Sequence, residues 1–170
     1  GSGKNIILRI AAGLVKQDQG IVSRNTKRMG FIFQEGGVQS SLTTIDNLIV
    51  PLVFTGLSER DAIEQARNAL AHFDLLGIQQ ESSSQLSAQS RMLLQYARAD
   101  ALGVEMLLAE EPLQGLGDKA QSKVEEWWKE GIVTGRRGAI LSTTDRSVAL
   151  RLDATILRIG PIPVDQKMIG

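Results

Sequence analysis

Hydrophobic positions occur along the chain in two patterns, short continuous runs and longer stretches with helical spacing. The runs predict strands buried on both faces, at residues 29–34, 106–109, 139–142 and 154–159. Helical spacing and capping signals predict helices between them, at residues 5–12, 43–53, 59–77, 87–99 and 119–129. Strands that alternate with helices in this way predict an α/β fold with a largely parallel sheet.

Several helix ends carry recognisable signals. Ser58 is a good N-cap for the helix that follows it, and Pro51 is expected to end the apolar helix before it. Asp118 is expected to cap the helix that carries Trp127 and Trp128. We expect one of these two tryptophans to pack in the core and the other to be half exposed.

The stretch 106–112 organises this arrangement, because its apolar run stops at Glu110, Glu111 and Pro112. Proline has no N–H and cannot continue the hydrogen-bonded ladder of a sheet. Ligands of open parallel sheets bind outside the carboxyl ends of the strands, and the two glutamates stand at such an end. By itself, this pattern fits a strand followed by an acidic turn equally well.

Composition and charge narrow the class of protein. A length of 170 residues suits one domain with a sizeable core, which should be aliphatic because 42% of residues are hydrophobic and 4% aromatic. Lys plus Arg equals Asp plus Glu at 19 each, which argues against a general nucleic-acid or membrane surface. The absence of cysteine gives no sign of a disulfide framework, and His72 has no companion ligand for a metal ion. No apolar run approaches the ~20 residues of a membrane helix, and no signal peptide opens the chain, so we expect a soluble cytoplasmic protein.

The first residues fit the second half of a phosphate-binding loop. Gly1, Ser2, Gly3 and Lys4 would open a helix whose backbone N–H groups bind phosphates, while the lysine reaches the outer ones. The Ser or Thr that usually follows this lysine as a Mg²⁺ ligand is replaced by Asn5. We expect the rest of the loop and the strand before it to precede residue 1, although so short a match also fits the remnant of an expression tag.

Six stretches in this order resemble the nucleotide-binding domain of ABC transporters, over nearly the whole chain. The family's phosphate loop and first helix are matched by GSGKNIILRIAAGLVKQDQG, and its Q-loop strand is matched by GFIFQ. Its signature and the helix that follows are matched by LSAQS and YARA. The Walker B strand is matched by MLLAEEP, the D-loop is matched by GLGD, and the switch region is matched by ILSTTD. The stretch FQEGGVQSSLTTIDNLIVPL is most similar to ATPases of the maintenance-of-lipid-asymmetry type, and FTGLSERDA to the lipoprotein-releasing type.

The resemblance implies an ATP site with Mg²⁺ and gives individual residues roles in it. Glu111 stands at the position of the general base, Gln34 would sense Mg²⁺ and the attacking water, and Thr144 replaces the switch histidine. The nucleotide would be bound by Gly1, Ser2, Gly3, Lys4, Asn5 and Ile6, and across a dimer interface by Ser87 and Gln89. The implied Mg²⁺ ligands, direct or through water, are Asn5, Gln34 and Glu110.

Departures from the family pattern concentrate at the residues that are expected to bind nucleotide and catalyse its hydrolysis. Asn5 replaces a hydroxyl with a longer amide, Glu110 replaces an aspartate, and Gly117 replaces the D-loop aspartate. Residues 88–90 place side chains where the family has Gly-Gly-Gln, and Thr144 lacks the imidazole of the switch. Catalysis depends on positioning that ~1 Å can spoil, so we expect hydrolysis to be weakened or lost before the fold is.

The resemblance also implies a domain organisation. Residues 1–170 would form a single ABC-type ATPase domain, P-loop NTPase-like, in which helices flank a mostly parallel sheet. A helical subdomain that carries the signature would occupy residues 43–100. Residues 20–29 leave little room for the antiparallel β-subdomain of the family. We therefore expect most of that subdomain, and the aromatic that stacks on adenine, to be missing or not represented.

Two functions remain open from the sequence. The chain is either the ATP-binding subunit of an ABC transporter that drives a permease, with lipid as the expected substrate, or a degenerate domain with a structural or regulatory role, for instance in a heterodimer. The ordered motifs disfavour an unrelated P-loop kinase or GTPase. The implied partners are membrane permease subunits and a second ATP-binding subunit, with no nucleic acid. The implied location is the cytoplasmic face of the inner membrane, bound peripherally.

Overall fold

The computed structural model describes residues 3–26 and 28–157. Helices separate its strands, with two 3₁₀ turns at Leu76–Ile78 and Ser83–Gln85. In chain order the elements are α1 (Lys4–Ala12), β1 (Met29–Ile32), α2 (Asp46–Phe54), α3 (Glu59–His72), α4 (Ala88–Ala101), β2 (Met106–Glu110), α5 (Asp118–Val133), β3 (Gly138–Ser142) and α6 (Arg146–Arg151).

The strands of the described residues form one parallel sheet in the order β1-β2-β3. Met29 of β1 pairs with Met106 of β2, which in turn pairs with Gly138 of β3. The central position of β2 explains its continuous apolar run, since residues 107–110 are all buried. The predicted α/β fold with a parallel sheet is therefore confirmed.

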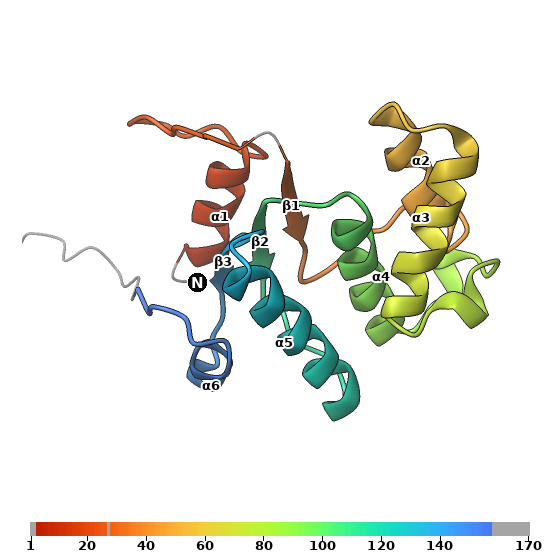
Figure 1. Cartoon of the computed structure of the whole chain (residues 1–170). Helices are drawn as coiled ribbons and strands as arrows, with labels where there is room; N and C mark the ends of the chain where they lie inside the picture. The colour runs from red at the N-terminus through yellow and green to blue at the C-terminus, as the bar shows by residue number, and fades with distance from the viewer. Residues whose placement is uncertain (1–2, 27, 158–170) are drawn as a thin grey trace, which may run out of the picture.

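The helices are divided between the two sides of this sheet. α1 packs on β2 and β3, α4 packs on β1, and α5 packs on β3. In Figure 1 the strand arrows point toward the end of the molecule at which α1 begins. The same view shows α2, α3 and α4 gathered beyond β1, on the opposite side of the molecule from α1. The carboxyl ends of all three strands thus open beside the first turn of α1.

Aromatic side chains join the gathered helices to α5. The ring centroids of Phe73 and Tyr96 lie 5.9 and 5.6 Å from that of Trp127. Trp127 and Trp128 are 3% and 1% exposed, so the prediction that one of them is half exposed is wrong. Trp127 can be buried because its indole N–H donates to Asp100 Oδ1 at 2.7 Å, which satisfies its one polar atom.

Three predicted helix ends differ from the structure. The helix after Ser58 ends at His72 rather than near Gly77, because the N–H of Leu75 bonds to the carbonyl of Leu70 and closes the last turn. The N-cap prediction for Ser58 is confirmed, since its side chain accepts from the N–H of Asp61.

The other two differences concern a proline and an N-cap. Pro51 lies inside α2, which continues to Phe54, so the prediction that the helix ends there is wrong. Pro51 is past the first turn of this short helix, so the helix forgoes one backbone bond there and still continues for one more turn. Gly117, not Asp118, is the N-cap of α5, and Asp118 occupies the first helical position, where its negative charge suits the helix dipole.

Two strand predictions also need correction. β3 was expected to be buried, yet Ile140 is 46% exposed, because β3 lies at the edge of the described sheet. Residues 154–157 form no strand after α6, and the rest of the strand predicted at residues 154–159 lies outside the described residues. Between α1 and β1 the described residues contain no strand either. Within residues 3–26 and 28–157, every helix is too short or too polar to span a bilayer.

Candidate functional site

β2 ends in two consecutive glutamates that lie in different environments. Glu110 is the last strand residue and is 1% exposed. Glu111 leaves the strand with a positive φ of 44°, a conformation that costs a residue with a side chain of order 1 kcal/mol. The N–H of Glu111 donates to the carbonyl of Ser142 at 2.8 Å, which fixes this turn against the end of β3.

The carboxylate of Glu111 brings three segments together. Its Oε1 lies 3.0 Å from Lys4 Nζ, in the first turn of α1. The hydroxyl of Thr143 donates to Oε2 at 2.9 Å, and the N–H of Thr144 donates to Oε1 at 2.9 Å. The structure thus places the predicted phosphate-binding lysine, general base and switch residue at one point, at the carboxyl ends of β2 and β3.

Glu110 is paired with Arg9, a residue that the sequence motifs did not single out. Arg9 Nε lies 2.7 Å from Glu110 Oε1, and its Nη2 donates to Oε2 at 3.0 Å. This two-pronged pair and the charge of Glu110 raise the pKa of the Arg9 guanidinium. One signal was present in the sequence: Arg9 follows Asn5 by four residues, so both side chains lie on the same face of α1.

The remaining predicted Mg²⁺ ligands also have partners in the chain. Asn5 Oδ1 accepts a hydrogen bond from the hydroxyl of Ser142 at 2.8 Å. Gln34 Nε2 donates to Oε1 of Gln114 at 2.8 Å. Among the described residues, no group of three or more His, Asp or Glu side chains is arranged to hold a metal ion. As they stand, Glu110 and Asn5 do not fit Mg²⁺, because the ion would have to compete with Arg9 and Ser142 for their oxygens. The hydrogen bond of Gln34 uses its amide nitrogen and leaves Oε1 for a metal.

The backbone before Gln34 is held by a buried glutamine on α4. Gln95 is 3% exposed, and its amide accepts from the N–H of Phe33 at 2.8 Å and donates to the Phe33 carbonyl at 3.1 Å. Arg98, whose pKa is lowered by burial, donates to the carbonyl of Gly37 at 2.6 Å. α4 therefore holds the chain on both sides of Gln34. A polar residue on the buried face of an amphipathic helix is the sequence signal for Gln95.

This contact predicts that Gly37→Ala destabilises the protein more than Gly36→Ala. The two glycines have φ values of 77° and 78°, so both substitutions carry the same backbone strain. A Cβ at Gly37 would overlap Gln95 Oε1, whereas a Cβ at Gly36 would have no atom within 4 Å. We expect the free energy of unfolding, measured with urea, to fall by about 2 kcal/mol more for Gly37→Ala, because Gln95 must abandon its bonds to Phe33. Equal losses would show that the loop yields without disturbing Gln95.

The signature residues lie apart from Lys4 and Glu111 in the single chain. Ser87 is the exposed N-cap of α4, and its side chain accepts from the N–H of Ser90 at 3.0 Å. Gln89, also exposed, accepts from the N–H of Gly117 at 2.9 Å. Their predicted contact with nucleotide across a dimer stays a prediction.

The other predicted phosphate-loop residues are placed only in part. Gly3 is the N-cap of α1 with a φ of 76°, and Ile6 is 47% exposed. Gly1 and Ser2 lie outside the described residues.

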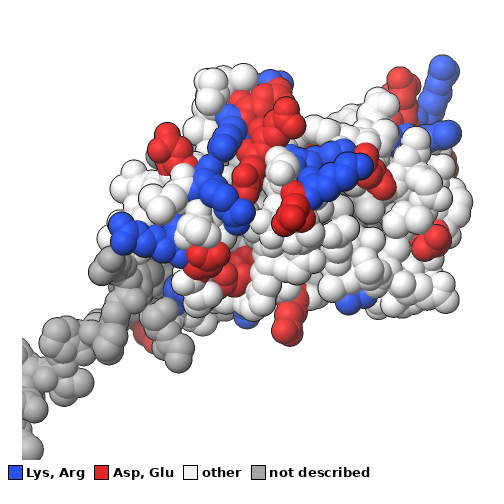
Figure 2. All heavy atoms as spheres, turned by 90° about the horizontal axis from the view of Figure 1, so that it is seen from below, with Lys and Arg blue, Asp and Glu red and all other residues white. Residues whose placement is uncertain are grey.

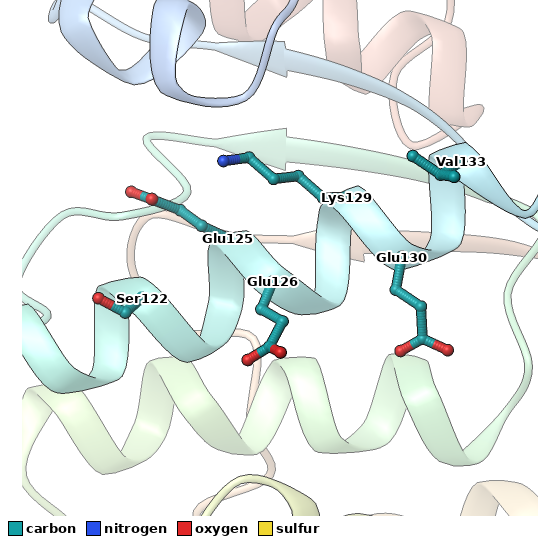
Figure 3. Close-up of a pocket in the computed structure, with 6 residues that line it drawn as sticks. All are labelled: Ser122, Glu125, Glu126, Lys129, Glu130 and Val133. Atoms are coloured by element: carbon teal, nitrogen blue, oxygen red, sulfur yellow. The ribbon is translucent and has the colours of Figure 1, made fainter.

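Of two hollows on the described part of the surface, one is at this site. The first, of about 290 Å³, is lined by Glu111, Gln114, Thr143 and Thr144, among others. The second, of about 400 Å³, follows α5 alone and is lined by three glutamates with Ser122, Lys129 and Val133 (Figure 3). Figure 2, which views the molecule from the end at which the strands point, shows basic and acidic side chains close together rather than a patch of one sign.

The family model described as ABC transporter matches residues 1–114. The lipoprotein-releasing system ATP-binding protein LolD of Legionella pneumophila (strain Paris) is 27% identical over 174 residues, which cover 92% of this chain and 76% of that protein. The taurine import ATP-binding protein TauB of Pseudomonas aeruginosa is 28% identical, over 99% of this chain and 67% of that protein.

Solved structures show the same fold. The dimeric structure of a bacterial ABC transporter cassette has a TM-score of 0.82 and 24% identity, over 88% of this chain and 73% of that one. A cassette dimer in a post-hydrolysis state, bound to ADP and phosphate, has a TM-score of 0.79 at the same identity and coverage. These similarities confirm the predicted P-loop NTPase-like fold.

Proposed function

The chain belongs to the ABC transporter family, and from that membership we propose that it is an ATP-binding subunit that works with a membrane permease. The observation that carries the proposal is the meeting of Lys4 and Glu111, 3.0 Å apart, where α1 begins and β2 ends. The first N–H groups of α1 and the Lys4 ammonium supply the donors and the positive charge that phosphates require. The nucleotide alone is the proposed ligand, because two of the three predicted Mg²⁺ ligands, Glu110 and Asn5, are engaged within the chain.

Lipid or lipoprotein is the proposed transport substrate. A lipoprotein-releasing protein is among the relatives, although taurine and sulfate importers are also among them. The loop and helix after Gln34 are the part of the chain that resembles lipid-traffic ATPases.

A second candidate function, a non-hydrolysing domain that regulates a competent partner, is favoured by one observation. Glu111, which would accept a proton from water, is ion-paired with Lys4 and hydrogen-bonded to Thr143 and Thr144. These three donors occupy the two oxygens with which Glu111 would take that proton. Thr144 offers no imidazole to compensate.

Two exposed surfaces suit the proposed partners. Ser87 and Gln89 at the start of α4 would face a second ATP-binding subunit. At the end of α2, Val53 and Phe54 are 43% and 87% exposed, an apolar surface suited to a permease. The loop after Gln34 is fastened to the start of the same helix, because the N–H of Gln39 donates to Asn47 Oδ1 at 2.8 Å. The protein would then lie peripherally on the cytoplasmic face of the inner membrane.

Cysteine crosslinking in native membranes tests this assignment. We expect Gln89→Cys to crosslink to an ATP-binding subunit and Phe54→Cys to a membrane-spanning protein, each identified by mass spectrometry. Ile21→Cys is the matched control, since Ile21 is 96% exposed but lies on the loop between α1 and β1, away from both surfaces. If neither test variant crosslinks more than the control, the chain does not work as a transporter subunit.

A further inference from the structure

The carboxylate predicted to face Mg²⁺ already faces a fixed cation. Arg9 engages both oxygens of Glu110, at 2.7 and 3.0 Å, and Glu110 is 1% exposed. Arginine stays protonated under all ordinary conditions, so this cation is permanent. A metal ion that approached Glu110 would have to displace a two-pronged, charge-assisted pair from a buried carboxylate, which is costly.

The side-chain amide of Asn5, which replaces the usual hydroxyl ligand, is hydrogen-bonded within the chain as well. Asn5 Oδ1, its only atom able to bind a metal, accepts a hydrogen bond from Ser142 Oγ at 2.8 Å. Gln34 would then be left to offer one neutral oxygen. Mg²⁺ demands near-ideal octahedral oxygen ligands and gives up its water reluctantly, so one neutral oxygen would bind the ion only weakly.

Before nucleotide binds, the charges of the site balance within the chain. Lys4 faces Glu111, and Arg9 faces Glu110. When a phosphate takes Lys4, Glu111 keeps its bonds from the Thr143 hydroxyl and the Thr144 N–H. No carboxylate oxygen is then left without a donor to attract a divalent cation.

We infer that this site binds nucleoside triphosphate without Mg²⁺, with Arg9 in the place of the metal beside Glu110. The inference rests on the proposed nucleotide site and states which form of the nucleotide enters it. Lys4 and the first turn of α1 bind the phosphates, while the Arg9–Glu110 and Asn5–Ser142 contacts keep α1 fastened to β2 and β3.

Calorimetric titration of the full-length protein with ATP, in Mg²⁺ or in EDTA at equal ionic strength, tests the inference. We expect the two dissociation constants to agree within about threefold. Lys4→Ala should weaken binding in both buffers by about tenfold or more, because it removes the phosphate-binding charge. Lys119→Ala, at a side chain that is 89% exposed on α5, should leave both constants unchanged.

Releasing Glu110 supplies the second arm of the test. Arg9→Met frees both oxygens of the carboxylate, and we expect ATP then to bind more tightly in Mg²⁺ than in EDTA. Arg9→Lys keeps a charge but not the two-pronged geometry, and it should shift the same way if Arg9→Met does not fold. If the wild-type protein binds ATP about tenfold more tightly in Mg²⁺ than in EDTA, the inference is overturned but the proposed nucleotide site is not. No binding in either buffer would overturn the nucleotide site and the inference together.

Discussion

Replacing Arg9 by methionine is expected to lower the free energy of unfolding by about 3 kcal/mol, as measured by urea denaturation. The substitution keeps most of the side-chain volume but leaves Glu110, 1% exposed, without its counter-charge. Breaking a buried ion pair from one side costs more than the pair contributes, because the remaining charge stays desolvated. Arg9 itself is 44% exposed, so we place the loss at the lower end of the range for buried pairs.

Two variants separate burial from charge in this measurement. Arg28→Met removes the same residue type from an ion pair with Glu105, but those side chains are 63% and 44% exposed, and we expect a loss below about 1 kcal/mol. Adding Glu110→Leu to Arg9→Met should recover most of the stability, since no buried charge is then unpaired. Equal losses for Arg9→Met and Arg28→Met would show that water reaches Glu110 in solution.

Replacing Glu111 by glutamine is expected to reduce the ATPase rate of the assembled transporter by at least about 100-fold. Glutamine has the same size and can accept the bond from the Thr144 N–H while it donates to the Thr143 hydroxyl, but it cannot take a proton from water. The affinity for ATP should not fall, because Lys4 is released from its ion pair. Thr144→His should raise a slow wild-type rate in the same assay by adding a donor for charge developing on the phosphate.

The control for this assay lies at the opposite end of the same strand. Glu105→Gln changes the same residue type just before β2, where the side chain is 44% exposed, and should leave the rate unchanged. A measurable rate that is equally unaffected by Glu111→Gln would assign hydrolysis to a partner chain. This chain would then be the regulatory half of the pair.

The fold was predictable where a local pattern of hydrophobic residues is enough to determine the structure. The apolar run 106–109 requires cover on both faces, and β2 is the covered, central strand. The similar run in β3 was misread as buried, because composition cannot tell which strand lies at a sheet edge. Asp118 was misassigned as a cap because Asp and Gly117 are both acceptable there, and only the backbone decides between them.

The site was predictable in its residues but not in its contacts. Lys4, Glu110 and Glu111 carry motif signals, and the structure brings Lys4 to Glu111 as a parallel sheet requires. Arg9 reads in the sequence as an ordinary exposed arginine of a helix. Its pairing with Glu110 joins residues far apart in the chain, and no local spacing encodes that meeting.

The connection between β1 and β2 bears on how the molecule folds. These strands are direct neighbours, yet α2, α3 and α4 all lie between them in the chain, so Met29 finds Met106 only after a long loop is closed. Closing such a loop costs entropy before any strand contact returns it, which slows the pairing of parallel strands. Contacts among the intervening helices are closer in sequence and are expected to form first, which shortens the effective loop. Glu110 and Glu111 stand at the end of β2, so we expect the chemistry of this protein to be assembled after the intervening helices form rather than before.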